Sequence, residues 1–180
     1  MIKTKPTFNP AALPSEYMST FEKQCSTAAG SKTHFLYPGQ LFVSQEGVTI
    51  STILGSCAAV CLWDRRKKMG GMNHYLLPEG LESSPNPYRY GNNANAALLN
   101  QLISRGSDVS DLQAKIFGGS SAFGADPENS LGAQNVLLAE EFLLKVHIPL
   151  MLKDTSGKRG RRLTFHTDDG THLLKVFDKV

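Results

Sequence analysis

Residues 48–77 read VTISTILGSCAAVCLWDRRKKMGGMNHYLL, and this stretch is the most informative about the fold. Its first part, residues 48–54, alternates and is rich in β-branched side chains, a pattern typical of a strand. A Gly-Ser pair ends that strand, and residues 58–64 form a second apolar segment. Four basic residues, 65–68, predict a charged turn before another strand candidate at residues 72–77. The stretch therefore predicts short strands joined by tight turns.

Outside this stretch, strand candidates continue along the chain and two helical patterns interrupt them. Residues 93–104 and 131–146 place apolar side chains at helical spacing, which predicts two amphipathic helices. The other short strand candidates are residues 35–37, 41–43, 113–117, 148–152, 162–166 and 172–176. We therefore expect the α/β class, as a single-domain layered α/β sandwich with mixed, largely antiparallel strands and two main amphipathic helices.

The first 33 residues differ from the rest of the chain. They contain three prolines and a polar run, with one short helix candidate around residues 15–24. We interpret residues 1–33 as an N-terminal extension of unassigned function and residues 34–180 as the folded domain.

Composition and charge exclude several classes of protein. The chain has 180 residues, enough for one ordinary domain, and its formal net charge of +3 is too small to predict nucleic-acid binding. Its longest unbroken apolar run, residues 58–63, is far shorter than the roughly 20 residues of a membrane helix. No apolar segment follows the charged first residues, so the start does not resemble a signal peptide. We expect a cytoplasmic, monomeric protein that does not insert into membranes.

The chain contains three cysteines, Cys25, Cys57 and Cys61. An odd number of cysteines without an export signal predicts reduced thiols rather than a disulfide framework. Cys57 and Cys61 have no further ligands at metal-binding spacing. We therefore expect no metal site at these cysteines.

Cys57 is a candidate nucleophile because it directly follows the Gly-Ser pair, where the backbone is tight. If Ala58 begins a helix, the amides at the helix start favour the thiolate over the thiol. Backbone N–H groups near Ser56 and Ala58 could then also hold an oxyanion. The alternative is a cysteine that only packs in the core, an interpretation that suits Cys61 better still.

His74 is the candidate general base among five histidines. If the charged turn joins antiparallel strands, Cys57 and His74 lie at nearly equal distances from its centre and therefore meet across the strands. A hydroxyl of Ser51 or Thr52 could orient the imidazole. The alternative is a histidine with a purely structural role.

Two other features carry weaker predictions. Residues 118–124 are rich in glycine but lack the Lys-[Ser/Thr] end of a phosphate loop, and with the loop at residues 79–91 they are candidates to shape a substrate groove. Near the C-terminus, basic side chains cluster in a turn. This turn is either simply solvated or a docking surface for an acidic partner, and the alternative for residues 160–162 is that they hold the C-terminal hairpin in shape. The basic residues of this turn are Lys158, Arg159, Arg161 and Arg162.

Several short motifs, in the same order along the chain, resemble those of the chemoreceptor glutamine deamidases of the CheD family. They run in family order over roughly residues 41–176, which is most of the chain, and the ordered set is more specific than any one motif. The motifs are LGSCAAVCL at 54–62, GGMNH at 70–74, RYG at 89–91, AKIFGG at 114–119, GAQN at 132–135 and GRR at 160–162. Residues 1–33 lie outside the resemblance.

The resemblance implies a bacterial cytoplasmic enzyme with a layered α/β fold and a Cys-His centre. Such an enzyme hydrolyses selected glutamine side-chain amides of methyl-accepting chemotaxis receptors to glutamate, and in many bacteria a CheC-type phosphatase regulates it. No metal or organic cofactor is implied. The competing interpretation is a non-catalytic adaptor that binds receptors or a CheC-type phosphatase, and a cysteine protease is a second rival.

Residue by residue, the resemblance places the nucleophile at Cys57 and the base at His74. The third catalytic residue of the family is a threonine six positions before the cysteine, and Ser51 occupies that position here. Thr52 follows one step later, but neighbouring strand residues face opposite sides and cannot replace one another. We expect Ser51 to serve as the third residue, with Thr52 as the alternative.

Overall fold

The stretch at residues 48–77 forms three strands, β3 (Val48–Leu54), β4 (Ala58–Asp64) and β5 (Met69–His74). The first two have the predicted bounds. The third begins and ends three residues earlier than predicted, because the ladder that pairs Asp64 with Met69 leaves only four residues for the turn. This computed structural model describes residues 32–121 and 129–177.

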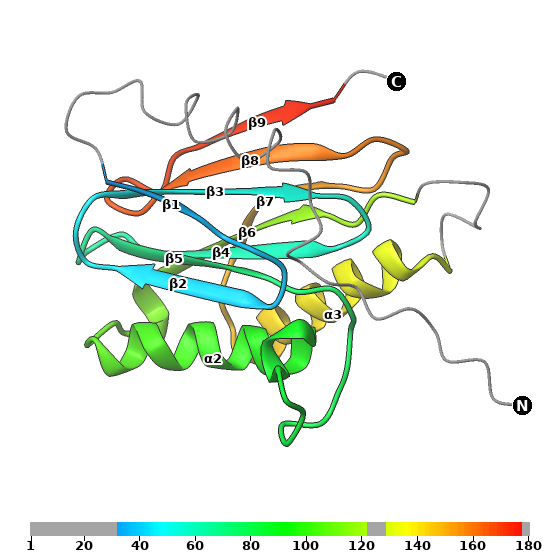
Figure 1. Ribbon diagram of the computed structural model, residues 1–180. Helices are drawn as coiled ribbons and strands as arrows, with labels where there is room; N and C mark the ends of the chain where they lie inside the picture. Colours follow the sequence, from blue (N-terminus) through cyan, green and yellow to red (C-terminus); the bar gives the residue numbers. More distant parts are fainter. Residues whose placement is uncertain (1–31, 122–128, 178–180) are drawn as a thin grey trace, which may run out of the picture. The chain divides into compact units, whose positions relative to one another are not determined.

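The strands belong to two sheets. One sheet has the order β1-β3-β8-β9 and the other has the order β2-β5-β4-β6-β7 (Figure 1). Two pairings among the described strands, β1 with β3 and β6 with β7, are parallel, and the other five are antiparallel. The remaining strands are β1 (Lys32–Phe35), β2 (Gln40–Ser44), β6 (Leu112–Gly118), β7 (Leu150–Thr155), β8 (Arg161–His166) and β9 (His172–Val176).

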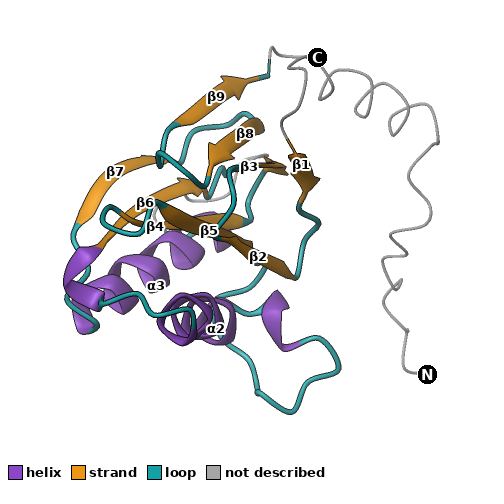
Figure 2. Ribbon diagram, turned by 90° about the vertical axis from the view of Figure 1, so that its left-hand side faces the viewer, coloured by secondary structure: helices purple, strands orange, loops and turns teal. Residues whose placement is uncertain are grey.

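Two helices form the third layer. The helices α2 (Gly91–Ser104) and α3 (Leu131–Lys145) cover the face of the five-stranded sheet that points away from the other sheet (Figure 2). Ser130 begins α3 by accepting a hydrogen bond from the Ala133 N–H at 3.1 Å, as an N-cap serine does. Short 3₁₀ turns, η2 (Pro87–Arg89) and η3 (Val109–Asp111), lie before α2 and before β6.

β4 is the central strand, and it is buried on both faces. Val60 and Leu62 belong to the core between the sheet and the helices, whereas Ala59 and Cys61 belong to the core between the two sheets. Because both faces are covered, the strand reads as a continuous apolar run rather than an alternating one. The Gly-Ser turn before β4 carries the chain from one sheet to the other.

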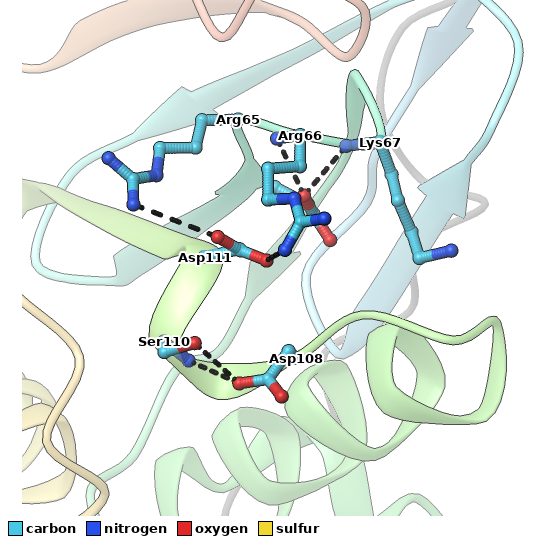
Figure 3. A network of polar contacts seen from close by, with 7 residues as sticks. Arg65, Arg66, Lys67, Asp108, Ser110 and Asp111 are labelled. Carbon is cyan, nitrogen blue, oxygen red and sulfur yellow. Dashed lines mark hydrogen bonds and ion pairs between the residues drawn. The ribbon is translucent and has the colours of Figure 1, made fainter.

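The charged turn after β4 is held by carboxylates (Figure 3). Asp64 Oδ1 accepts hydrogen bonds from the backbone N–H groups of Arg66 at 2.9 Å and Lys67 at 2.8 Å. The Asp111 carboxylate pairs with Arg66 at 3.4 Å and with Arg65 at 3.7 Å. These contacts fix the turn that returns β5 beside β4.

The predicted fold class is confirmed. The predicted domain start is wrong by two residues, because β1 begins at Lys32 and pairs there with Val48 of β3. The strand predicted at residues 148–152 begins two residues later and ends three residues later, as β7. The helix candidate at residues 15–24 lies outside the described residues. In the described part of the chain, no helix is long and apolar enough to cross a membrane.

Candidate active site

The side chain of His74 lies in the interior between the two sheets. It is about 1% exposed, and it is the only fully buried one of the five histidines. Its Nδ1 is 2.8 Å from the Thr52 hydroxyl, which comes from β3 in the opposite sheet. His74 and Thr52 therefore form a contact across the two sheets.

The hydrogen bonds of Thr52 determine which imidazole nitrogen carries the proton. The hydroxyl donates its only hydrogen to the Leu36 carbonyl at 2.7 Å, so it must accept from His74 Nδ1–H. Nε2 then has a free lone pair, and it is buried without a hydrogen-bond partner among the described residues. In this tautomer Nε2 is the nitrogen that can act as a general base.

Burial keeps His74 neutral. It lowers the pKa of the imidazole from 6.5 to about 4, although the Leu36 carbonyl opposes the shift. A group with a pKa near 4 is unprotonated at neutral pH. His74 is thus ready to accept a proton there.

Cys57 lies on the same face as His74. The β4–β5 ladder pairs Cys61 with Met72, and a further bridge pairs Ala58 with Tyr75, so His74 stands opposite Ala59. Cys57 is two residues before Ala59, and it packs against the same core between the sheets. Diagonal neighbours of this kind on two adjacent strands have Cα atoms about 7–8 Å apart, a distance that two side chains can span.

The structure corrects the expected environment of Cys57. Ala58 begins a strand and not a helix, so no helix start favours the thiolate. Burial raises the pKa of the Cys57 thiol above 9.0, whereas its own backbone N–H and the charge of Arg89 lower it. Cys57 and His74 are therefore a neutral thiol and a neutral imidazole at pH 7.

This protonation state predicts how the free thiol reacts with pH. The rate of Cys57 alkylation by iodoacetamide should rise through pH 9 and above, because only the thiolate reacts. A thiolate–imidazolium pair would instead give a plateau between pH 5 and 7, which would contradict the neutral pair. The measurement is labelling followed by mass spectrometry, with buried Cys61 as the slow internal reference, since burial raises the pKa of its thiol as well.

The backbone donors near the thiol differ from those expected. The Ala58 N–H donates to the Tyr75 carbonyl at 3.1 Å, so the prediction that Ala58 holds an oxyanion is wrong. Among the described residues, the N–H groups of Ser56 and Cys57 donate to no backbone carbonyl. These two remain candidate oxyanion donors.

The expected role of Ser51 also changes. Ser51 is buried, but the alternation of β3 turns it away from the face that carries Ile50, Thr52 and Leu54. Thr52, the alternative named from the sequence, is the residue that contacts His74. The prediction that the Ser51 hydroxyl orients His74 is therefore wrong, because Ser51 does not face the imidazole.

Comparison with known proteins bears on the family of this chain. A family model described as CheD chemotactic sensory transduction matches residues 76–176. A protein of Anaeromyxobacter dehalogenans, named a probable chemoreceptor glutamine deamidase CheD 1, is 43% identical over 142 residues, which cover 78% of this chain and 82% of that protein. This chain belongs to the CheD family. The resemblance found in the sequence is thereby confirmed.

Two further proteins are similar to this chain. A probable chemoreceptor glutamine deamidase CheD of Stenotrophomonas maltophilia is 38% identical over 140 residues, 78% of this chain and 71% of that protein. Among solved structures, the hypothetical protein YfiH of Bacillus licheniformis is 12% identical with a TM-score of 0.46, over 74% of this chain and 62% of its own. Cys57 and His74 precede the residues that the CheD family model matches.

Asn135, in a motif typical of the CheD family, reaches the site from α3. Its Nδ2 donates to the Ser56 carbonyl at 3.0 Å and to the Leu76 carbonyl at 2.9 Å. Its backbone carbonyl accepts from the Tyr75 hydroxyl at 2.6 Å. Sequence reasoning noted Asn135 only as part of a motif, because no local pattern shows which distant carbonyls a helical amide will meet.

The glycine-rich segment forms a wall of the Cys57 turn. Gly118 has φ +105°, and a Cβ there would lie 2.3 Å from the Cys57 carbonyl oxygen, so only glycine fits. The Gly119 N–H donates to that same oxygen at 2.8 Å. Residues 122–124, the rest of the predicted groove segment, lie outside the described residues.

Only part of the basic cluster near the C-terminus of this CheD-family chain is exposed at the surface. Arg159 is exposed, but Arg161 is about 4% exposed and pairs with Asp154 at 2.5 Å. Arg161 also donates to the carbonyls of Asp154 and Ser156, and Arg162 is half-buried. The prediction that Arg161 belongs to a docking surface is wrong, because its guanidinium joins β8 to the end of β7.

The position of Arg161 predicts a loss of stability. Arg161→Ala should reduce the free energy of unfolding by about 2 kcal/mol, since a charged donor and its bonds to two carbonyls are removed. For a domain of this size, the melting temperature should fall by about 4–8 °C. Arg159→Glu serves as the surface control, and equal melting of the two variants would contradict a structural role for Arg161.

Proposed function

We propose that this chain is a protein-glutamine deamidase that hydrolyses the side-chain amide of glutamines in methyl-accepting chemotaxis receptors, producing glutamate and ammonia. The observation that carries the proposal is the buried contact between Thr52 and His74, which leaves Nε2 as a free base on the face shared with Cys57. The two curated relatives described above are both named as probable chemoreceptor glutamine deamidases.

The first half of the reaction forms a thioester. His74 Nε2 removes the thiol proton as the Cys57 sulfur attacks the carboxamide carbon, so the neutral pair becomes charged only during the attack. The N–H groups of Ser56 and Cys57 donate to the oxyanion. His74 then returns the proton to the leaving nitrogen, the carbon–nitrogen bond breaks, and ammonia departs.

The second half releases glutamate. His74 Nε2 removes a proton from a water molecule that attacks the thioester carbon, and the carbon–sulfur bond breaks. The Cys57 sulfur regains its proton from His74. Throughout both halves the Thr52 hydroxyl accepts from Nδ1–H, which keeps Nε2 directed at the reacting atoms and stabilises the imidazolium. No step of this proposed reaction involves a metal or an organic cofactor.

The direct test is incubation with the cytoplasmic fragment of a chemoreceptor. We expect release of ammonia and a mass gain of about 1 Da for each modified glutamine, since NH₂ is replaced by OH. Binding of the fragment without a change in mass would instead favour the adaptor. A cytoplasmic location, a CheC-type partner and a monomeric state stay predictions.

The hydroxyl next to His74 can be tested separately. Thr52→Val keeps the shape of the side chain but removes the acceptor for Nδ1–H, so kcat should fall on the order of 10- to 100-fold. Ser51→Ala is the matched control, and it should change kcat much less because Ser51 faces away. The opposite ranking in steady-state kinetics would transfer the role to Ser51.

A further inference from the structure

Asn135 occupies the point where the pairing between β4 and β5 ends. The last bridge of this pairing joins Ala58 with Tyr75, so Cys57 and Leu76 are the next positions and have no ladder bond of their own. At that point the Asn135 side chain donates both of its amide hydrogens, one to the Ser56 carbonyl and one to the Leu76 carbonyl. The side-chain amide of Asn135 thus links the two segments at the point where the backbone hydrogen bonds between β4 and β5 end.

The orientation of this amide is fixed by its partners. A flipped side chain would put Oδ1 against two carbonyl oxygens, which have no hydrogen to donate. Oδ1 is buried without a hydrogen-bond partner among the described residues, so the carbonyls are the contacts that orient the group. Asn135 itself is fully buried.

The two carbonyls belong to the segments that carry the proposed catalytic pair. Ser56 directly precedes Cys57, and Leu76 follows His74 by two residues. A shift of either segment would change the distance between the thiol and Nε2. Displacements of about 1 Å are enough to cost on the order of 100-fold in rate.

We propose that Asn135 is a positioning residue for the Cys57–His74 pair, acting through the carbonyls of Ser56 and Leu76. This proposal rests on the proposed deamidase function. Asn135 does not touch the reacting atoms. Its effect is to hold the Cys57 turn closed against the end of β5, which also keeps the thiol half-buried.

The helix α3 also has contacts that do not involve this side chain. Tyr75 donates to the backbone carbonyl of residue 135, and that bond survives any substitution there. Gly119 and Gly132 also fit closely, since a Cβ on Gly132 would lie 2.5 Å from the Gly119 carbonyl oxygen. A change of the Asn135 side chain should therefore loosen the turn and leave the helix in place.

The test uses Asn135→Asp, which keeps the size of the side chain but sets a carboxylate oxygen against the two carbonyls. We expect kcat for receptor deamidation to fall on the order of 10- to 100-fold while KM changes by less than about threefold. Alkylation of Cys57 at pH 8 should become faster, because an opened turn exposes the thiol and removes part of the burial that raises its pKa. Activity and thiol reactivity thus move in opposite directions.

Two controls separate local loosening from unfolding. Cys61 is about 1% exposed, so it should stay unlabelled in the variant, whereas unfolding would label Cys57 and Cys61 together. Gln134→Glu makes the same chemical change at the exposed neighbouring position of α3, and it should alter neither readout. Asn135→Ala is the second variant, to be used if Asn135→Asp labels at Cys61.

The outcomes distinguish this proposal from the proposed function. If the wild-type protein releases no ammonia, the deamidase function fails, and the labelling of Cys57 still tests the positioning role. Unchanged kcat and unchanged Cys57 labelling in a folded variant would overturn the positioning role alone. It would also be overturned if both variants label at Cys61, because Asn135 would then be required for the whole fold.

Discussion

Replacement of Cys57 by alanine is expected to abolish deamidation, with a loss in kcat of at least about 10⁴-fold. No other described side chain on this face can form the thioester: the only other cysteine in the described residues, Cys61, is fully buried. The measurement is ammonia release from a receptor fragment together with the mass of the fragment. A Cys57→Ala variant with activity near that of the wild type would rule out the assignment.

The structure also offers the matched control for this experiment. Cys61 lies on the same face of β4, four residues further along, and packs in the core between the sheets. Cys61→Ala should lower the melting temperature slightly, because it removes buried volume, and it should retain activity. Cys57→Ala removes a half-buried atom group and should melt close to the wild type. Loss of activity without loss of stability therefore identifies the nucleophile.

The architecture was predictable where local pattern and tertiary packing agree. Residues 48–54 and 58–64 form the strands that their composition predicts, and α3 begins at the predicted residue. The assignment of these strands to two different sheets was not predictable. The Gly-Ser turn looks like any tight turn in the sequence, and only the pairing of β3 with β8 and of β4 with β6 shows where each strand belongs.

The placement of Cys57 and His74 on one face of neighbouring strands was predictable, but other details of the candidate site were not. Thr52 could have been preferred over Ser51 from alternation alone, because it shares a face with Ile50 and Leu54, whose apolar side chains must point into the core. The alternation of β3 favoured Thr52, but Ser51 was preferred because it stands six positions before Cys57, as the threonine of the family does. The protonation state of Cys57 could not be predicted, since it depends on burial between two sheets.

The wrong prediction for Arg161 and the missed role of Asn135 have the same physical origin, because both depend on contacts with polar groups of another element. Arg159 and Arg161 lie in one basic run. The sequence does not show that Arg161 pairs with Asp154 on another strand while Arg159 is exposed. Asn135 meets the Ser56 carbonyl 79 residues away in the chain. Contacts between polar groups on different elements leave no periodic trace, so a single sequence does not reveal them.

Replacement of His74 by alanine should lower kcat on the order of 10²–10⁴-fold, the usual range for loss of a general base. The imidazole is buried and makes its contact with Thr52, so Thr52→Val, which removes that contact, should add little to the loss in a His74→Ala background. His34 and His166 are the controls: the first stacks on Phe42 and the second contacts Thr49, both outside the Cys57 turn. A loss in a folded His34→Ala or His166→Ala variant equal to that of His74→Ala would show that the base is misassigned.

The pH dependence gives an independent check on the same residue. Because burial lowers the pKa of His74 to about 4, the base is unprotonated above that pH and becomes protonated below it. The value of kcat/KM for the wild type should therefore stay level from about pH 8 down to about pH 5 and fall through pH 4. The fall must be separated from acid unfolding by circular dichroism at the same pH values. A fall centred near 6.5, the ordinary value for histidine, would mean that the base is an exposed histidine and that His74, buried against Thr52, does not accept the proton.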